Sequence, residues 1–150
     1  MNLFRKFRKN SELEDCDPNK IQTFSFENIE TMCKIVSFYD GDSCTIVIKY
    51  FGKLIKLKCR LKGIDTPEIR SDDVIEKMAA QYVKRYVSKY HSKILKVRIF
   101  HNDKYGRQLV EIFDNGCSIN EDLIKNGMAY RYDGKTKKKF LEWYNVTLRY

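Results

Sequence analysis

Three runs of alternating residues, separated by very short gaps, constrain the fold of this chain more than any other feature. Residues 32–39, 43–50 and 54–62 alternate apolar and polar side chains, and the third run reads Ile-Lys-Leu-Lys-Cys-Arg-Leu-Lys from Ile55 onward. A period of two is typical of a half-buried strand. Asp-Gly and Phe-Gly dipeptides occupy the two gaps, which leaves room only for tight turns. The runs therefore predict an antiparallel meander.

A helix is expected next, over about residues 73–90. Apolar residues recur there at intervals of three and four, and Asp72 or Asp73 precedes them where an N-cap residue would lie. We expect the tyrosines of this stretch to face the core. The recurring residues are Ile75, Met78, Ala79, Tyr82, Tyr86 and Tyr90.

The remaining chain predicts two further strands and two further helices. The strands span 94–100 and 108–113, and a capping-box sequence, Ser-Ile-Asn-Glu from Ser118, opens a short helix that Gly127 ends. An extended piece, 128–132, leads to a last helix over about 136–149. That helix is expected to turn Phe140, Leu141, Tyr144 and Leu148 inward.

Three strands, a helix and two more strands is the element order of an OB-fold, a five-stranded barrel that usually holds oligonucleotides or oligosaccharides. The predicted fold class is therefore α+β, dominated by a five-stranded OB-fold barrel with about three helices. The predicted organisation is an arm over residues 1–28 and one domain over residues 29–150. The arm mixes charges and has few apolar residues, so we expect it to be flexible and solvated. A nonspecific nucleic-acid or membrane contact through its basic residues, Arg5, Lys6, Arg8 and Lys9, is the alternative.

Charge and cysteine usage limit the partners and the compartment. The formal net charge is +9, from 29 Lys and Arg against 20 Asp and Glu, which favours a polyanion such as nucleic acid as the partner. The five cysteines are odd in number and lack Cys-x-x-Cys spacing, so they indicate buried free thiols rather than a zinc site. No stretch approaches the roughly 20 apolar residues of a membrane span, and the basic start has no apolar run behind it. We expect an intracellular monomer.

The candidate site begins where the third run ends. Arg60 falls on the polar face of that run, and Gly63 and Pro67 end the strand so that Asp65 and Glu68 lie in the turn that follows. Carboxylate oxygens suit a hard cation, Ca²⁺ or Mg²⁺, and the planar guanidinium of arginine suits a phosphate. A turn of this composition is often purely structural, so its chemistry depends on other segments joining it.

Two other segments of the chain carry residues that could join this turn. Asp40-Gly41-Asp42-Ser43 precedes the stretch and Asp103-Lys104-Tyr105-Gly106-Arg107 follows it. Together with Arg60 and the Asp-Thr-Pro-Glu sequence five residues later, they make the chain resemble the staphylococcal nuclease, or thermonuclease, family. Ser43 stands where that family has threonine. The resemblance covers most of the chain beyond residue 31.

The resemblance implies a nuclease that hydrolyses phosphodiester bonds of DNA or RNA with Ca²⁺, Mg²⁺ being the less favoured ion. Asp42, Asp65 and the backbone carbonyl of Thr66 would bind the ion. Glu68 would act as general base next to a metal-associated water, and Arg60 and Arg107 would hold the scissile phosphate.

Substrate contacts form the next layer of the expected site. Tyr130 and Tyr132 lie two residues apart in an extended segment, share a face and would offer bases a stacking platform. Tyrosines buried in the core of a strand are the alternative. Lys104 and Tyr105 would contact a neighbouring phosphate. Because stacking and phosphate contacts tolerate any sequence, we expect single-stranded DNA or RNA to bind with little base preference.

Two other classes of function compete with an active nuclease. A binding-only OB module would need no more than the tyrosines and the basic surface. A histidine-based nuclease is disfavoured because His91 and His101 are the only histidines and neither lies in a motif.

Overall fold

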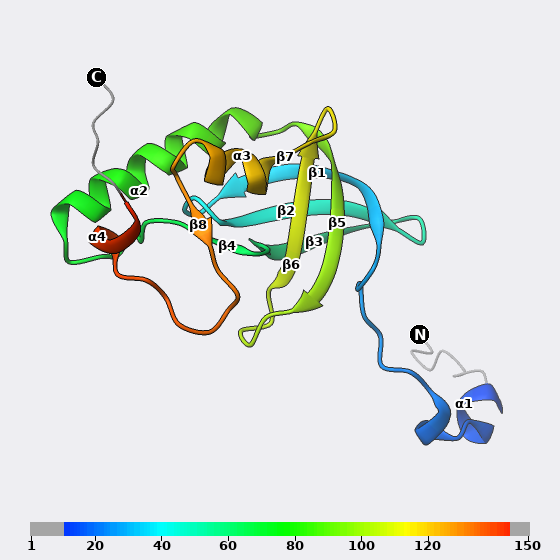
Figure 1. Ribbon diagram of the computed structural model, residues 1–150. Helices are drawn as coiled ribbons and strands as arrows, with labels where there is room; N and C mark the ends of the chain where they lie inside the picture. Colours follow the sequence, from blue (N-terminus) through cyan, green and yellow to red (C-terminus); the bar gives the residue numbers. More distant parts are fainter. Residues whose placement is uncertain (1–10, 145–150) are drawn as a thin grey trace, which may run out of the picture.

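A closed barrel of five strands forms the body of the protein in a computed structural model that describes residues 11–144 (Figure 1). The strand order is β3-β2-β1-β5-β6, and pairing between β3 and β6 closes the ring. The predicted OB-type barrel is therefore confirmed. Its strands are β1 (Glu30–Phe38), β2 (Ser43–Tyr50), β3 (Lys53–Leu61), β5 (Ile94–Asn102) and β6 (Gln108–Asp114).

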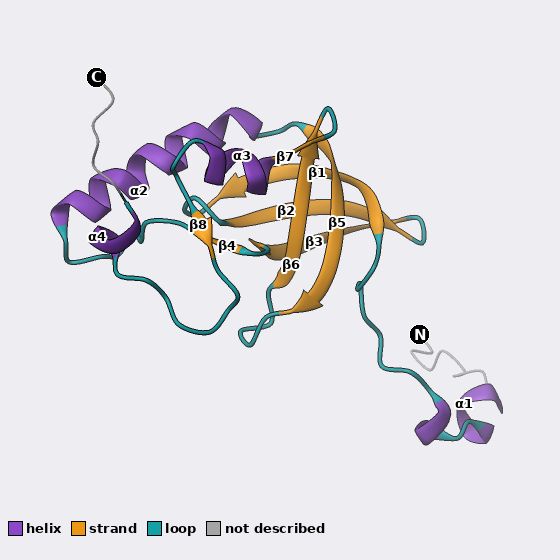
Figure 2. Cartoon of the chain, in the orientation of Figure 1, coloured by secondary structure: helices purple, strands orange, loops and turns teal. Residues whose placement is uncertain are grey.

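Short strands and helices surround the barrel. The two-residue strands β4 (Ile64–Asp65) and β8 (Tyr130–Arg131) pair with each other, and β7 (Cys117–Ser118) pairs with β6. Helices α2, α3 and α4 gather on one side of the barrel, whereas α1 stands away from it on the N-terminal segment (Figure 2). The helices are α1 (Ser11–Asp15), α2 (Val74–Val87), α3 (Ile119–Lys125) and α4 (Phe140–Trp143), with 3-10 turns η1 (Pro18–Lys20) and η2 (Ser88–Tyr90).

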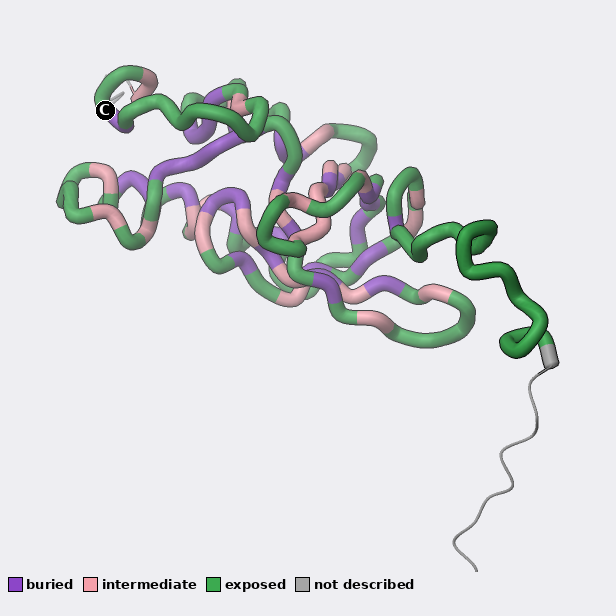
Figure 3. The backbone as a smooth tube through the Cα atoms, turned by 90° about the horizontal axis from the view of Figure 1, so that it is seen from below, coloured by how far each residue is buried: buried purple, intermediate pink, exposed green. Residues whose placement is uncertain are grey.

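The alternating runs build the barrel wall as predicted. Ile46 of β2 lies opposite Ile35 of β1 on one side and Leu57 of β3 on the other, and all three are buried. Their neighbours along each strand point outward, so buried residues alternate with intermediate or exposed ones along the tube in Figure 3. Burying an aliphatic side chain of this size stabilises the fold by about 1.5–3 kcal/mol. The inward-facing apolar residues of each strand therefore fix the register in which that strand pairs with its neighbours.

The segment that carries Asp65 begins where β3 pairs with β6 and closes the barrel. Strands β3 and β6 run parallel and pair only over residues 59–61 and 108–110. The chain then turns at Gly63, whose φ of +77° lies in the left-handed region that glycine adopts without steric cost. Strand β4 follows at once and carries Asp65 alongside the end of β3.

Helix α2 packs against the barrel with a face that matches the predicted one only in part, since Ala79, Tyr86 and Tyr90 contact the core as expected and Ile75 and Met78 do not. Asp73 caps it as expected, because its carboxylate accepts from the backbone N–H groups of Ile75 and Glu76. The buried residues within α2 are Ala79, Ala80, Val83 and Val87, and Tyr90 of η2 is buried beside them. Tyr82 is 55% exposed, so the expectation that every tyrosine here faces the core is wrong.

The close approach of the β1–β2 turn to α2 explains why Val83 lies on the buried face of this helix. A Cβ atom on Gly41, in the β1–β2 turn, would lie 2.5 Å from Cγ1 of Val83. At that spacing only short side chains fit between the helix and the turn. Val83 occupies this contact, whereas the larger Met78 and Tyr82 are 68% and 55% exposed.

The last helix is shorter than predicted. It begins at Phe140 rather than at Thr136, and Glu142 accepts from the backbone N–H of Lys139 at 3.1 Å, which caps its start. Phe140 is buried as expected, whereas Leu141 is 69% exposed. The predicted continuation through Leu148 lies outside the described residues.

The segment before β1 is anchored only near its end. Residues 12–21 are exposed, but Phe26 is buried in the core cluster with its ring 5.3 Å from that of Tyr50. All five cysteines are free thiols, three of them buried. Among residues 11–144, no helix is long and apolar enough to cross a membrane.

Candidate active site

Arg60 lies at the centre of a charged network at the closed end of β3. Its Nη1 donates to Oδ1 of Asp42 at 2.9 Å, and its Nη2 donates to Oδ1 of Asp65 at 2.6 Å. A third bond runs from Nη2 to the backbone carbonyl of Ile64 at 3.3 Å. One guanidinium thus holds the two acids that the sequence predicts as metal ligands.

The β1–β2 turn places Asp42. Asp40 accepts from the backbone N–H groups of Asp42 and Ser43, at 3.2 and 2.8 Å, which shapes the turn. Asp42 itself is 2% exposed, and its second oxygen accepts from the backbone N–H of Thr66 at 3.2 Å. Burial raises the pKa of the Asp42 carboxyl to about 7, although the charge of Arg60 opposes the shift.

Asp65 is held from the opposite side by Tyr130. The phenol Oη of Tyr130 donates to Oδ2 of Asp65 at 3.0 Å and accepts from the backbone N–H of Lys138 at 3.0 Å. Burial raises the pKa of Tyr130 to about 12, so the phenol keeps its proton. Its ring packs 4.7 Å from that of Trp143. Tyr130 is therefore a buried holder of Asp65 and does not present the open stacking face that the sequence suggested.

Glu68 lies at the rim and is bound to a residue that we did not predict. Nζ of Lys137 bonds to Oε1 of Glu68 and lies 3.0 Å from Oδ1 of Asp65. Burial acts to lower the pKa of the Lys137 ammonium, but the bonds to Glu68 and Asp65 outweigh it and the pKa is raised. The Glu68 side chain remains 48% exposed.

Arg107 joins the network from the turn between β5 and β6. Its Nε donates to Oδ2 of Asp103 at 2.7 Å, and its Nη1 donates to Oγ of Ser43 at 3.1 Å. Ser43 in turn donates to Oδ1 of Asp42 at 3.1 Å. The serine that replaces the family threonine therefore links the two arginine sites.

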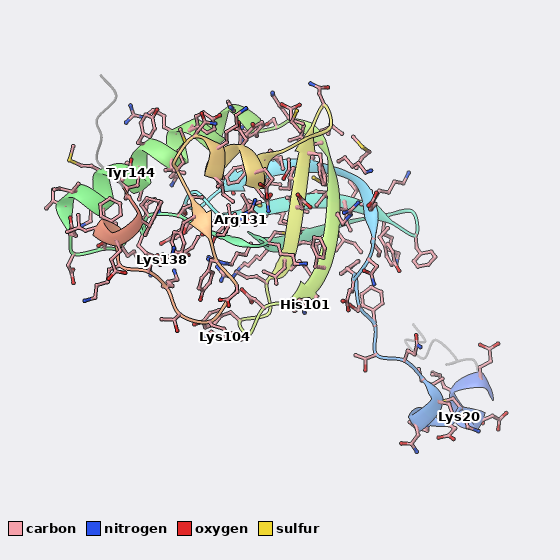
Figure 4. The ribbon with its side chains drawn as sticks, viewed as in Figure 1. Lys20, His101, Lys104, Arg131, Lys138 and Tyr144 are labelled. Carbon is pink, nitrogen blue, oxygen red and sulfur yellow. The ribbon has the colours of Figure 1, made fainter. Side chains whose placement is uncertain are left out.

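A cleft of about 790 Å³ opens over this network. The β5–β6 hairpin borders it on one side, where Figure 4 labels Lys104, and the segment after β8 borders it on the other. Tyr105, which is 73% exposed, and Tyr132 also line it. Of the predicted substrate contacts, Lys104, Tyr105 and Tyr132 face the cleft, and only Tyr130 is buried.

Three participants were missed or left without a role in the sequence analysis. Lys137 lies within a lysine-rich run, Lys-Thr-Lys-Lys-Lys, where no spacing distinguishes one lysine from the next. Asp103 was visible in its motif, yet its function as the anchor of Arg107 depends on the hairpin turn. Ser43 became informative only when the fold set it between Arg107 and Asp42.

The donor atoms near Asp42 fit a hard cation in part. Asp42 and Asp65 supply carboxylate oxygens close enough to share one guanidinium, and oxygen donors suit Ca²⁺ or Mg²⁺. Within residues 11–144, however, no three or more His, Cys, Asp or Glu side chains cluster in a way that could hold a metal. An ion would depend on two carboxylates, a backbone carbonyl and water.

The fold and the site together define a class of protein, an OB-type barrel with an arginine–carboxylate cluster at the end of its third strand. Residues 58–146, more than half of the chain, match the family described as Staphylococcal nuclease homologue. The chain belongs to that family.

Relatives extend the family across plants and bacteria. An uncharacterized 38.1 kDa protein of Capnoides sempervirens is 36% identical over 55% of this chain and 23% of its own length. A staphylococcal-like nuclease of Arabidopsis thaliana is 34% identical over 60% of this chain and 27% of its own length. An uncharacterized endonuclease of Escherichia coli is 29% identical over 67% of this chain and 60% of its own length. The chain thus spans about a quarter of the plant relatives.

Proposed function

We propose that this chain is a nuclease that hydrolyses phosphodiester bonds of DNA or RNA with little base preference. Membership of the family supports a hydrolase acting on nucleic acid. The observation on which the proposal rests is the continuous network that joins Arg107, Asp42 and Asp65, which come from three separate motifs. Phosphodiester hydrolysis needs positive charge around phosphorus and a group that accepts a proton from water, and the network offers both.

Arg60 and Arg107 would hold the scissile phosphate. Each guanidinium is already oriented by a carboxylate, Arg60 by Asp42 and Asp65 and Arg107 by Asp103. Oriented donors lose little freedom when the phosphate arrives, and the planar fork binds two oxygens at once. Within residues 11–144, Nη2 of Arg107 has no hydrogen-bond partner, so it is available to the substrate.

Glu68 would accept the proton of the attacking water. It is the one acid of the network whose side chain is half exposed, and it lines the cleft. A general base of this kind contributes roughly 10² to 10⁴ in rate. Its bond to Lys137 uses Oε1, and within residues 11–144 Oε2 has no hydrogen-bond partner and is open to water.

Asp42, Asp65 and the backbone carbonyl of Thr66 would hold a divalent cation, and we propose Ca²⁺ over Mg²⁺. The bound ion would supply charge that stabilises the phosphate oxygens during attack. Lys137 and Arg60 both contact Oδ1 of Asp65, and Lys137, the more exposed of the two, would withdraw from it for that carboxylate to serve as a ligand. Lys104, Tyr105 and Tyr132 would contact the substrate on either side of the scissile bond, whereas Tyr130 would act by positioning Asp65.

A binding-only OB module is the second candidate, and one observation favours it. Arg60 and Lys137 already neutralise both Asp42 and Asp65, as counter-ions would in a site that never holds a metal. Such a module would bind the same single strands in the same cleft without cutting them.

Digestion of single-stranded DNA in Ca²⁺ and in EGTA separates the two candidates. We expect cleavage in Ca²⁺ and its loss in EGTA. Glu68→Gln should fold normally, by circular dichroism, and lose at least 10²-fold in kcat. Glu121→Gln is the matched control and should keep wild-type turnover, because Glu121 is similarly exposed but pairs with Arg131 and does not line the cleft.

Three results would contradict this assignment. Undiminished cleavage in EGTA would exclude Ca²⁺ as the required ion, and wild-type turnover by Glu68→Gln would exclude Glu68 as the base. Binding without cleavage under both conditions would establish the binding module instead.

A further inference from the structure

The hairpin that leads into the site carries positive charge only. Residues 43–64 contain no Asp or Glu but six Lys and Arg residues, and they include all of β2 and β3. The cations are Lys49, Lys53, Lys56, Lys58, Arg60 and Lys62.

Two of these lysines form a row with Arg60. In β3 the residues Leu57, Cys59 and Leu61 are buried, so the alternate residues point outward. Lys56 and Lys58 are exposed on this outward face, and Arg60 continues it into the cleft. Residues two apart in a strand are about 6.6–6.8 Å apart. Successive phosphates of an extended single strand are separated by a similar distance.

Across the hairpin, the row has uncharged and basic neighbours. Thr45 of β2 lies opposite Lys58 and Val47 lies opposite Lys56. Lys49 follows on the same face, opposite Leu54. The outward face of both strands is thus uninterrupted by negative charge.

These lysines also differ from the outward cations of β5. Lys96 and Arg98 of β5 both pair with Glu30 of β1, which cancels part of their charge. Within residues 11–144, Lys49, Lys56 and Lys58 make no ion pair and no contact with an aromatic ring. Their charge is free to act on a ligand, and Lys58 lies two residues from Arg60, which lines the cleft.

We infer that the outward face of β3 is a track for the phosphates of a single nucleic-acid strand that extends beyond the cleft, with Lys58 and Lys56 as successive contacts. The inference rests on the proposed function, because the track has a use only if the strand passes Arg60. Phe51, at the far end of the hairpin, is 88% exposed and supplies a ring on which a base can stack. Contacts of this kind carry no base preference and favour long strands over short ones.

Edge protection is the competing explanation for the same lysines. Strand β3 pairs with β6 only over residues 59–61, which leaves residues 53–58 as a free edge. Lysines on a free edge hinder pairing with a second chain. This explanation predicts aggregation of a lysine-free variant, and it predicts no dependence on the length of a bound strand.

Oligonucleotide binding as a function of salt tests the track. The full chain carrying Glu68→Gln, which limits cleavage, is compared with the same chain carrying Lys56→Gln and Lys58→Gln. Lys77→Gln with Lys125→Gln, on exposed helical positions, makes the same change in net charge elsewhere. The probes are labelled thymidine oligonucleotides of about four and about twelve residues, a range that matches the site sizes of OB folds.

We expect the track variant to bind the long probe roughly ten-fold more weakly, with a slope against log salt that falls by about 1.4. The short probe should bind it within about twofold of the parent, and the helical control should bind both probes like the parent. An equal loss for both probes, or no loss for the long one, would overturn the track. Aggregation without a change in binding would assign the lysines to edge protection. Failure of the parent chain to bind either probe would instead refute the proposed function.

Discussion

The buried carboxylate of Asp42 serves the site but lowers the stability of the folded protein. It is an acid at 2% exposure whose pKa burial raises to about 7. An acid with a raised pKa binds more protons in the folded state than in the unfolded state between its two pKa values. Stability therefore falls as pH rises from about 4 to about 7, and the cost is fully present above that range.

Asp42→Asn should accordingly be more stable than the wild type at pH 8 in EDTA, by about 1–2 kcal/mol in the free energy of unfolding. The gain should shrink as pH falls toward 5, because the wild-type acid then takes up its proton. Urea unfolding at both pH values measures the difference. A variant less stable at pH 8 would show that the ion pair with Arg60 outweighs burial.

A bound cation should compete with the ammonium group of Lys137 for the carboxylates of the site. Its ammonium lies on Asp65 and Glu68, so binding an ion at Asp65 has to displace it. Lys137→Gln should therefore bind Ca²⁺ roughly five-fold or more tightly than the wild type, by isothermal titration calorimetry.

Lys135→Gln is the control for that titration. Lys135 also lines the cleft, but its side chain makes no ion pair within residues 11–144. It should change the Ca²⁺ affinity by less than about twofold. An equal gain in Ca²⁺ affinity in both variants would mean that Lys137 acts only through the net charge of the cleft and does not compete directly for Asp65.

At the scale of elements, the site depends on how closely the β1–β2 turn approaches α2. Gly41 leaves no space for a side chain, because an added Cβ would lie 2.5 Å from Val83 and 2.9 Å from Thr66. The turn and the helix must separate to accept one, and Asp42 is the next residue in the turn.

Gly41→Ala should therefore lower the free energy of unfolding by about 1–3 kcal/mol and also reduce activity. Adding Val83→Ala should relieve part of the clash, so that the double variant is more stable than the two single losses predict. Strict additivity across this cycle would mean that the contact with Val83 does not limit the turn.

Helix α2 also shows which part of an element its sequence can predict. Its span and its Asp73 cap follow from local rules, since a capping carboxylate contacts only the next few backbone N–H groups. Its buried face follows only in part, because Ala79 was expected but the burial of Val83 depends on the closeness of the turn opposite. Apolar periodicity alone favoured the larger Met78 and Tyr82.

On the scale of the whole molecule, the boundary between arm and domain at residue 28 stays a proposal. Phe26 lies on the arm side of that boundary but is 9% exposed in the core cluster. Phe24 packs against it at 4.8 Å between ring centroids. The barrel therefore uses side chains that precede its first strand.

Removing residues 1–21 should change the free energy of unfolding by less than about 0.5 kcal/mol, since residues 12–21 are exposed. Removing residues 1–28 should cost about 3 kcal/mol, because Phe26 is lost from the core. Phe26→Ala in the full chain should reproduce most of that loss, as measured by urea unfolding. Equal stability of the two truncated chains would place the boundary where the sequence suggested.

The sequence by itself determined the barrel and the members of its site. Strand alternation and short turns are local properties, and they specify a meander because each strand has one apolar side to bury. The three motifs likewise named Asp42, Arg60, Asp65, Glu68 and Arg107, although their roles remain proposals.

Only the tertiary structure decided which of these residues contact one another. Closure of β3 on β6 and the turn at Gly63 set Asp65 beside Arg60, and the segment before α4 delivers Lys137 to both Asp65 and Glu68. The same packing buries Tyr130 against Trp143 and turns its phenol toward Asp65. Contacts between segments more than 60 residues apart leave no local pattern, because their geometry exists only once the barrel has closed.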